Sequence, residues 1–169
     1  FTYPDPVNVI EDLRPIIGNA MYIGSGAMGV VVNHAGQILM VKRNDDGIGG
    51  LERQWVIPGG YTHMGENPAY TAVREVYEES GIEIGIERIL GIFSPPEAWI
   101  YPNGDQTQAV VTVFLAHPTG GAARPDQVET SQVMWKDAQA ILELKTHPML
   151  QRLNRAVVSY LETGTFLSG

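Results

Sequence analysis

Three glutamates, Glu75, Glu78 and Glu79, fall within one short stretch of the segment 60–82, GYTHMGENPAYTAVREVYEESGI. In a helix, which turns about 100° per residue, Glu79 lies about 40° to one side of Glu75 and Glu78 about 60° to the other. The three carboxylates therefore share one predicted face, and Arg74 is predicted to point to its side. Like charges at this spacing repel each other, although a solvated acidic face is common on surface helices. Hard cations such as Mg²⁺ or Mn²⁺ take oxygen ligands and reverse that repulsion, so the cluster indicates a divalent-metal site.

A wider pattern of fixed spacing surrounds this cluster. Its members, in order along the chain, are Gly60, Glu66, the run Arg74-Glu75-Val76, the pair Glu78-Glu79 and the pair Gly81-Ile82. The intervals resemble the Nudix box, Gly-x5-Glu-x7-Arg-Glu-U-x-Glu-Glu-x-Gly-U, where U is a bulky aliphatic residue, and every fixed position is matched. The lead-in WVIPGG and the later turn YPNGD are also similar to members of this family. The resemblance to the Nudix (MutT-like) hydrolase superfamily covers residues 22–145.

This resemblance implies a fold and a metal site. Nudix hydrolases share an α+β fold, an α/β/α sandwich in which a mixed β-sheet lies between helices, and their box forms a loop, a helix and a loop. Carried over to this chain, Glu75, Glu78 and Glu79 are expected to bind Mg²⁺ or Mn²⁺. The backbone carbonyl of Gly60 is expected to be a further ligand.

Other box residues are expected to hold the site in shape. By the same resemblance, Glu66 and Arg74 form an ion pair that orients the loop and the helix. Gly60 permits a close approach to the backbone, and Gly81 ends the helix. These are structural roles, although Arg74 is also counted with the catalytic residues.

The family's reaction is the attack of water on a diphosphate linkage, usually within a nucleoside diphosphate joined to another group. Metal ions neutralise charge on the phosphates and lower the pKa of the attacking water, while a carboxylate accepts its proton. Within the box, Glu78 or Glu79 is the expected base, and Glu75 and Arg74 complete the predicted catalytic set. Glu129, in the segment QVETSQVMW, stands where many members have an acidic residue before a tryptophan. It is therefore a further candidate, and its alternative is a solvated loop carboxylate.

Two arginines and three aromatic residues outside the box are candidates for binding substrate. Arg43 and Arg53 flank the loop before the box and are candidates for phosphate contacts, although single surface arginines are usually only solvated. Trp55 and Tyr101 are candidates for stacking on a base, as is Trp99, although aromatic residues beside strands more often belong to the core.

The substrate class stays open at this point. ADP-ribose or a nucleotide sugar is favoured, and Pro95 and Pro96 stand near, but not at, the position of a proline common in ADP-ribose pyrophosphatases. A nucleoside triphosphate or a dinucleoside polyphosphate is the alternative. A Nudix module that senses a nucleotide without cleaving it is an alternative of another class, but such modules tend to lose box glutamates, and this chain keeps all of them.

Strand-like and helical patterns alternate along the chain. Helices are predicted over 7–18, 68–80, 137–144 and 148–164, and strands over 26–33, 37–43, 55–60, 86–94, 98–102, 108–117 and 130–136. The first two strands are predicted to form a hairpin around the turn HAGQ. The segments 44–54 and 117–129 are predicted loops.

Composition limits the classes of function. The 169 residues suffice for one domain, predicted as an extension with a short helix over 1–21 and a Nudix domain over 22–169 that ends in a helix. A net charge of −8 without a Lys/Arg stripe argues against binding a nucleic-acid polymer, and the lack of a long apolar window argues against a membrane partner. Without cysteine there is no disulfide or thiolate site. The expected location is the cytoplasm, the expected partner is a small nucleoside diphosphate derivative, and the N-terminal segment could pack across a homodimer interface.

Overall fold

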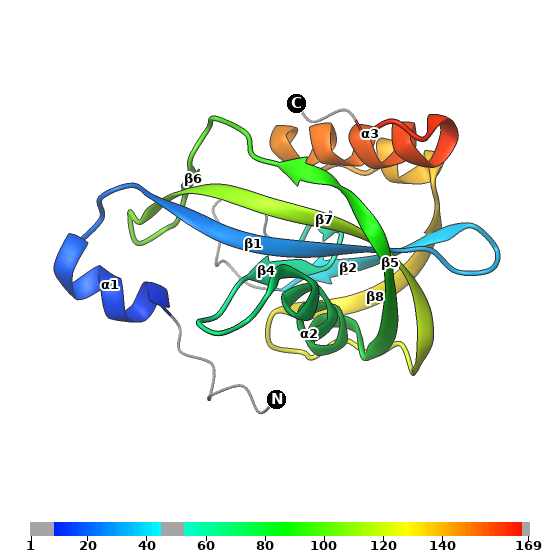
Figure 1. The fold of residues 1–169 in the computed structure, drawn as a ribbon, viewed down its shortest axis with the longest axis horizontal. Helices are drawn as coiled ribbons and strands as arrows, with labels where there is room; N and C mark the ends of the chain where they lie inside the picture. The colour runs from blue at the N-terminus through cyan, green and yellow to red at the C-terminus, as the bar shows by residue number, and fades with distance from the viewer. Residues whose placement is uncertain (1–8, 45–52, 167–169) are drawn as a thin grey trace.

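The computed structural model describes residues 9–44 and 53–166, and the statements below concern these residues alone. Figure 1 shows strands in the middle of the molecule and helices on opposite sides of them. The elements, in chain order, are α1 (Val9–Ile17), β1 (Tyr22–Val31), β2 (Gln37–Arg43), β3 (Trp55–Val56), β4 (Gly59–Tyr61), α2 (Pro68–Ser80), β5 (Ile82–Phe93), β6 (Trp99–Ile100), β7 (Gln106–Gly121), β8 (Thr130–Asp137), the 3₁₀ helix η1 (Gln139–Glu143) and α3 (Pro148–Thr163). The predicted α+β fold, with a mixed sheet between helices, is confirmed.

The strands form two sheets. In the first sheet, β1 pairs in parallel with β7 along its whole length, and β4, β5 and β6 pair antiparallel with their neighbours. In the second sheet, β2 lies between β3 and β8 and is antiparallel to both. The long parallel pairing of β1 with β7 is what makes the first sheet mixed.

The hairpin predicted from 26–33 and 37–43 is only partly right. Its turn forms, because Gly36 has a φ of +77° and its N–H donates to Asn33 O at 2.9 Å. Val32 and Ile38 make a single bridge next to this turn, and beyond it β1 and β2 diverge into different sheets. Turn chemistry encodes only the local bend, whereas the distant partners β7 and β8 decide where each strand pairs.

Several other segments differ from the prediction in extent, among them the predicted strand 86–94, since β5 already begins at Ile82. The predicted strand 55–60 forms two short strands, because Ile57 and Pro58 separate β3 from β4 and proline has no N–H for a ladder. The predicted loop 117–129 begins as a strand, since β7 continues to Gly121, which pairs with Ile82 at the start of β5. The predicted helix 137–144 is the 3₁₀ helix η1. Within the predicted loop 44–54, residues 45–52 lie outside the described residues.

Helix α2 covers the predicted residues, and its ends show why. Asn67 Oδ1 accepts the N–H of Tyr70 at 2.9 Å, and Pro68 fills the first helical position. At the other end Gly81 has a φ of +71°, and its N–H donates to Tyr77 O at 2.8 Å. The helix packs against β1, β4 and β5, so its side chains have a fixed position relative to the turn before β4.

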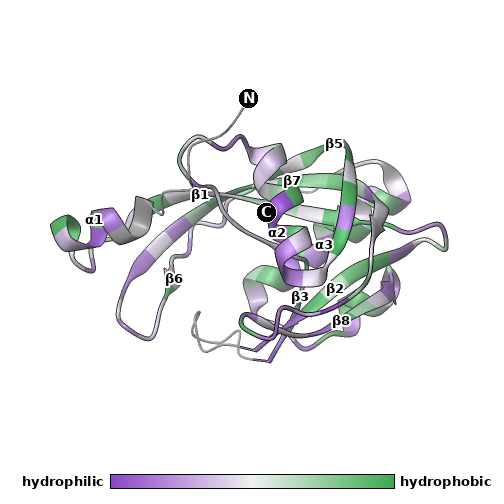
Figure 2. Ribbon diagram, turned by 90° about the horizontal axis from the view of Figure 1, so that it is seen from below, coloured by the Kyte–Doolittle hydropathy of each residue, from purple (hydrophilic) through white to green (hydrophobic). Residues whose placement is uncertain are grey.

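The main hydrophobic core lies between the sheets and beneath α3, where Figure 2 shows hydrophobic residues on β2 and β7. Its buried members include Val30, Met40, Phe93, Leu153 and Val157. This packing fixes the strand ends that border the site described below. Among the described helices, none combines the length and the apolarity that crossing a bilayer requires.

Helix α1 belongs to the predicted N-terminal extension 1–21. Arg14 Nε lies 3.1 Å from the carboxylate of Asp105, and Arg14 Nη2 donates to Gln106 O at 3.3 Å. The guanidinium also lies over the ring of Tyr22, 4.9 Å from its centre. These contacts join the extension to the start of β1 and of β7.

Candidate active site

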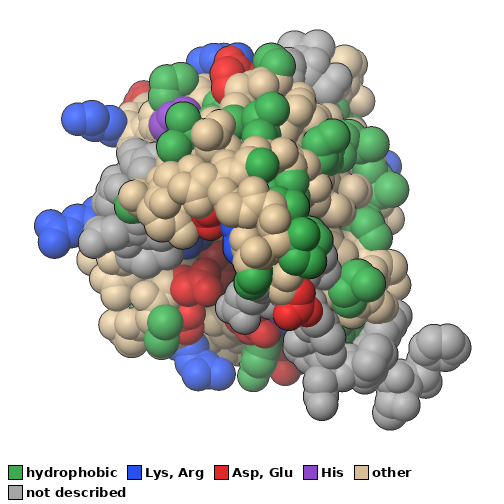
Figure 3. Space-filling view, turned by 90° about the vertical axis from the view of Figure 1, so that its left-hand side faces the viewer, with side chains coloured by type: hydrophobic (Ala, Val, Ile, Leu, Met, Phe, Trp, Pro, Cys, Tyr) green, Lys and Arg blue, Asp and Glu red, His purple; other side chains and the backbone are tan. Residues whose placement is uncertain are grey.

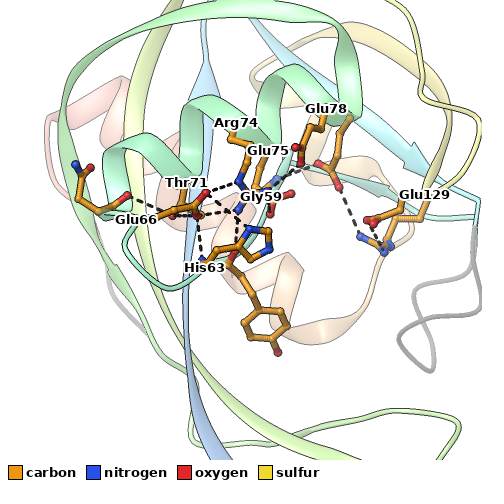
Figure 4. Close-up of polar contacts among 12 residues, drawn as sticks. Gly59, His63, Glu66, Thr71, Arg74, Glu75, Glu78 and Glu129 are labelled. Carbon is orange, nitrogen blue, oxygen red and sulfur yellow. Dashed lines mark hydrogen bonds and ion pairs between the residues drawn. The ribbon is translucent and has the colours of Figure 1, made fainter. Parts of the chain in front are cut away.

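Glu66 and Arg74 connect the box loop to helix α2 (Figure 4). The carboxylate of Glu66 accepts Arg74 Nε at 2.7 Å and Arg74 Nη2 at 3.0 Å, and its side chain is 4% exposed. It also accepts the N–H of His63 and the hydroxyl of Thr71, each at 3.0 Å. Burial alone would raise the pKa of Glu66, but the hydrogen bonds from Arg74, His63 and Thr71 lower it to about 2. The carboxylate is therefore ionised, and the loop is held firmly against the helix.

Arg74 also reaches the glutamate cluster, which corrects the prediction that it points to the side. Its Nη1 donates to Glu75 Oε1 at 2.8 Å and to Glu78 Oε2 at 2.9 Å, and its Nη2 donates to Tyr61 O at 3.0 Å. A helical wheel gives the direction of Cβ, whereas a long arginine side chain bends around the helix. Burial alone would lower the pKa of Arg74. The bonds to Glu66 and Glu75 act in the opposite direction with a larger effect and raise this pKa above its usual value, so the guanidinium stays charged.

Glu79 is buried on the face of α2 that packs against the sheets, not on the solvated stripe of the helical wheel. Its exposed fraction is 2%, and its Oε2 accepts the N–H of Gly59 at 3.0 Å. Its Oε1 is buried without a hydrogen-bond partner and lies 3.7 Å from Arg43 Nη1. Burial, followed by the nearby charge of Glu75, raises the pKa of Glu79 well above its usual value. An oxygen in this position calls for a cationic partner.

The carboxylate of Glu75 rests against the backbone of Gly60. A Cβ placed on Gly60 would lie 2.5 Å from Glu75 Oε1, so glycine is what lets this carboxylate lie against the backbone in its present position. Burial raises the pKa of Glu75 to about 7, and Glu78 and Glu129 add to this effect, while Arg74 opposes it. The Gly59–Gly60 start of β4 and the helix face therefore share one crowded, acidic space.

Glu129 reaches the same space from the loop before β8. Its Oε2 lies 3.8 Å from Arg43 Nη2, and the side chain is 56% exposed. Figure 3 shows acidic side chains gathered in a hollow of this face, beside basic atoms. The two ion pairs place Arg43 between Glu79 and Glu129. The structure thus brings together Glu75, Glu78, Glu79 and Glu129, as the sequence predicts.

The residues present fit a divalent metal ion, with one qualification on geometry. The donors are carboxylate and carbonyl oxygens, which hard cations prefer, and the unpartnered Oε1 of Glu79 adjoins the charge of Glu75. Within the described ranges, no three acidic or histidine side chains are already grouped as a complete ligand set. Glu78, 55% exposed, is held by Arg74 instead. Mg²⁺ usually keeps several waters and substrate oxygens, so a partial protein set suits it.

A cavity of about 110 Å³ opens beside this acidic space. The residues that line it are Gly26, Met28, Arg43, Val56, Ile57, Gly59, Gly60, Tyr61, Phe93, Pro95, Trp99, Ala109, Val111, Leu150 and Leu153. Its walls are thus mainly apolar, while Gly60 and Arg43 border both the cavity and the carboxylates. The arrangement accommodates a molecule with a charged centre and a flat apolar end.

The predicted substrate residues are placed unequally around this cavity. Arg43 lines it, whereas Arg53, Trp55 and Tyr101 are absent from its described lining. Trp55 lies near Lys42, whose Nζ is 6.0 Å from the ring centre. Tyr101 shares a 3.0 Å hydrogen bond with Tyr61, and burial and this neighbour raise its pKa.

Sequence reasoning did not single out several lining residues. Tyr61 follows Gly59 and Gly60 directly in the sequence, a position that could have drawn attention to it. Met28, Phe93 and Leu150 come from three separate elements, and no local pattern relates them. Their shared role depends on the packing of the two sheets and α3.

A family model described as the NUDIX domain matches residues 23–156, well over half of the chain. A MutT-like protein of Streptomyces ambofaciens is 30% identical over 116 residues, which are 68% of this chain and 64% of that protein. A putative 8-oxo-dGTP diphosphatase of Bacillus subtilis (strain 168) is 33% identical over 110 residues, which are 65% of this chain and 64% of that protein. The matched stretch thus spans less than two thirds of these two relatives.

A solved structure shows the same fold. The NUDIX hydrolase from Nitrosomonas europaea aligns with a TM-score of 0.68 at 17% identity, over 87% of this chain and 76% of that chain. The range matched by the family model contains the box, both sheets and the first half of α3. With the fixed box residues placed around one acidic space, the chain belongs to the NUDIX domain family.

Proposed function

We propose that this chain hydrolyses a diphosphate linkage in a nucleoside diphosphate derivative, with Mg²⁺ or Mn²⁺ as cofactor. The observation that carries the proposal is the convergence of the box glutamates and Glu129 beside Gly59 and Gly60 at the start of β4, next to an apolar cavity. Oε1 of Glu79, which is buried without a hydrogen bond and has the Arg43 cation 3.7 Å away, supports a cation at this place. Membership of the NUDIX family supports the same reaction.

Glu75, Glu79 and the carbonyl of Gly60 are the proposed metal ligands. When bound, the cation neutralises phosphate charge and makes a coordinated water more acidic. Glu78 is the fourth proposed ligand, and it must first leave Arg74 Nη1, which its exposed position allows. Arg74, held by Glu66, keeps Glu75 oriented. These residues fix the charge distribution before substrate arrives, which is how preorganised sites accelerate phosphoryl chemistry.

Glu129 is the proposed base that accepts the proton of the attacking water. Its side chain is 56% exposed, so water reaches it, whereas the 2% exposed Glu79 is occupied by the N–H of Gly59. Glu78 is the second candidate, because it is equally exposed, but Arg74 holds one of its oxygens. The expectation that the base lies within the box is thereby revised in favour of the loop carboxylate.

The cavity is the proposed site of the nucleoside. Trp99 and Phe93 offer aromatic surface to a base, and Arg43 stands at its mouth, where the phosphates would lie. Arg53 and Trp55 are assigned no role here because they lie outside this lining. Tyr101 would act only through Tyr61, to which it is hydrogen-bonded.

ADP-ribose or a nucleotide sugar remains the favoured substrate, because Pro95, near the position of a proline common in ADP-ribose pyrophosphatases, lines the cavity. A nucleoside triphosphate is the alternative that gains support from the Bacillus subtilis relative, which is named a putative 8-oxo-dGTP diphosphatase. The remaining alternatives are a dinucleoside polyphosphate as the substrate and a module that senses a nucleotide without cleaving it. Cytoplasmic location and a homodimer through the N-terminal segment are further proposals, and size-exclusion chromatography with light scattering tests the latter.

The deciding experiment is a turnover panel. ADP-ribose, nucleotide sugars, dinucleoside polyphosphates and (deoxy)nucleoside triphosphates are each incubated with Mg²⁺, with Mn²⁺ and with EDTA, and the products are separated. Metal-dependent cleavage of one class supports the hydrolase and names its substrate group. No cleavage of any compound, together with a ligand-induced rise in melting temperature, would replace the hydrolase with the sensing module.

A further inference from the structure

The loop that carries Glu129 is docked onto the end of α2 that carries Glu79. The last carbonyls of a helix lack partners within the helix and need donors from elsewhere. Here Ser80 O accepts the N–H of Arg124 at 2.8 Å, and Glu79 O accepts the hydroxyl of Thr130 at 2.8 Å. One segment, residues 124–130, therefore completes the helix end and delivers Glu129.

Asp126 fixes the shape of this segment. Its Oδ1 accepts three successive N–H groups, from Val128 at 3.0 Å, Glu129 at 3.0 Å and Thr130 at 2.8 Å. The turn they close contains Gln127 at a φ of +67°, a left-handed conformation that costs about 1 kcal/mol or more for a residue with a side chain. A single carboxylate oxygen thus stabilises the turn with its left-handed Gln127, and it accepts the N–H of Glu129 within that turn.

Thr130 connects this turn to the helix. Its side chain is fully buried, and its hydroxyl oxygen lies 2.8 Å from Glu79 O and 3.1 Å from Asp126 Oδ1. A hydroxyl has one proton, so the shorter contact, to a carbonyl that can only accept, takes it. The lone pairs of the hydroxyl then accept the N–H of Asp126 at 3.3 Å. Thr130 therefore connects the turn at Asp126 directly to Glu79, whose carboxylate is buried in the acidic space.

A third contact holds Glu129 from the other side. The N–H of Asn44, just beyond β2, donates to Glu129 O at 2.7 Å. Both backbone polar groups of Glu129 are therefore engaged, its N–H by Asp126 and its carbonyl by Asn44. The side chain of Glu129 lies beside Arg43, with Oε2 3.8 Å from Arg43 Nη2.

We infer that Asp126 and Thr130 are positioning residues for the reaction, which set the backbone of Glu129, and with it the region that its carboxylate can reach, relative to Glu79. The inference rests on the proposed function, in which Glu129 is the base. Neither residue touches the acidic space itself, so each acts through another group. A displacement of about 1 Å at a reacting group can cost on the order of 100-fold in rate, which is the scale available to such residues.

Thr130 offers a matched set of variants. Thr130→Val keeps the shape of the side chain and removes the hydroxyl, whereas Thr130→Ser keeps the hydroxyl. Ser131→Ala is the control, because the neighbouring Ser131 also donates its hydroxyl to a backbone carbonyl, Lys42 O at 3.3 Å, away from Glu79. We expect Thr130→Val to lower kcat by about 10-fold or more with KM nearly unchanged, and Thr130→Ser and Ser131→Ala to stay within about twofold.

A second readout does not need turnover. Removing a group that supports a metal ligand typically lowers the metal affinity by about 10- to 100-fold. The rise in melting temperature on titration with Mn²⁺ is therefore measured without substrate, and Thr130→Val should require about 10-fold more Mn²⁺ than Thr130→Ser for the same rise.

Asp126 tests whether the effect passes through Glu129. Asp126→Ala removes the acceptor, Asp126→Asn keeps an oxygen at the same place, and each is combined with Glu129→Gln. We expect Asp126→Ala to lower kcat by about 10-fold in the native background and by less than about twofold in the Glu129→Gln background, with Asp126→Asn closer to wild type. A folded Asp126→Ala with wild-type kcat, or a loss of equal size in both backgrounds, would overturn the inference. A wild-type chain without turnover or any response to Mn²⁺ would instead remove the proposed function, and this inference with it.

Discussion

The guanidinium of Arg43 lies 3.7 Å from the carboxylate of Glu79 and 3.8 Å from that of Glu129, and so joins the helix to the loop outside the box. Arg74 serves Glu66, Glu75 and Glu78 in the same way. Among the described residues, two guanidinium groups thus face five carboxylates. The acidic space carries an excess of negative charge that a divalent cation would offset.

The metal-free protein should lose stability as the pH rises. The pKa of Glu75 is raised from 4.5 to about 7 in the folded state, so its proton is held more tightly there than in the unfolded chain. The contribution of Glu75 to the free energy of unfolding is fully present below pH 4.5. It is lost as the pH rises through about 7, by an amount on the order of 3 kcal/mol. Glu79 acts in the same direction. Urea unfolding in EDTA between about pH 5 and 8 measures this decline, and a free energy of unfolding that rises over that range would contradict it.

Replacing Glu79 by glutamine should change stability and activity in opposite directions. Glu79→Gln removes a buried charge whose Oε1 has no hydrogen-bond partner, and the amide oxygen of the new side chain can still accept the N–H of Gly59. We expect the variant to be more stable than the wild type at about pH 8 in EDTA, by on the order of 1 kcal/mol, and to lose the stabilisation that Mg²⁺ gives the wild type. Thermal unfolding with and without Mg²⁺ checks both parts. Equal stabilisation of both proteins by Mg²⁺ would argue against Glu79 as a ligand.

Arg74→Lys should unfold more easily, because lysine cannot reproduce the branched contacts with Glu66, Glu75 and Tyr61 O. We expect a loss of about 2–4 kcal/mol in the free energy of unfolding at about pH 7. Arg152→Lys is the matched control, since Arg152 also lies 2.7 Å from a carboxylate, that of Glu97, but on the exposed surface. The control should unfold like the wild type in the same urea titration. Similar losses in both variants would show that burial of the Arg74 pair does not matter.

Gly26→Ala should disturb the proposed carbonyl ligand without touching a carboxylate. A Cβ on Gly26 would lie 2.7 Å from Gly60 O, so the backbone at Gly60 has to move. We expect about a 10-fold or larger rise in the Mg²⁺ concentration needed for half-maximal turnover. Gly85→Ala is the control, because its Cβ would meet only the side-chain end of the half-exposed His117, at 3.0 Å, and that of Thr119, at 3.3 Å. An unchanged Mg²⁺ requirement in a folded Gly26→Ala would count against Gly60 as a ligand.

The sequence was sufficient for the parts of the site that depend on local spacing. The bounds of α2 follow from Asn67, Pro68 and Gly81, whose cap and turn preferences act over a few residues. The box residues could be named because their intervals are fixed, and the box glutamates Glu75, Glu78 and Glu79 do gather beside Gly60. Glu129 was found only through resemblance to a family, since nothing in its own neighbourhood marks it.

Long-range packing explains what the sequence did not reveal. The burial of Glu79 depends on where the sheets lie relative to α2, and the helical wheel contains no such information. The parallel partner of β1 is more than 80 residues away in β7, beyond any turn signal. The roles inferred for Asp126 and Thr130 likewise depend on a loop meeting a helix end, which only the folded chain brings together.

The most direct test of the central claim compares wild type with the double variant Glu78→Gln/Glu79→Gln. Cleavage of the substrate identified by the panel is followed over a titration of Mg²⁺, with Glu143→Gln, an exposed glutamate outside the site, as control. The account predicts that the double variant loses at least about 100-fold in Mg²⁺-dependent kcat while the control keeps wild-type activity. A folded double variant with full Mg²⁺-dependent turnover would contradict the claim that these glutamates hold the metal.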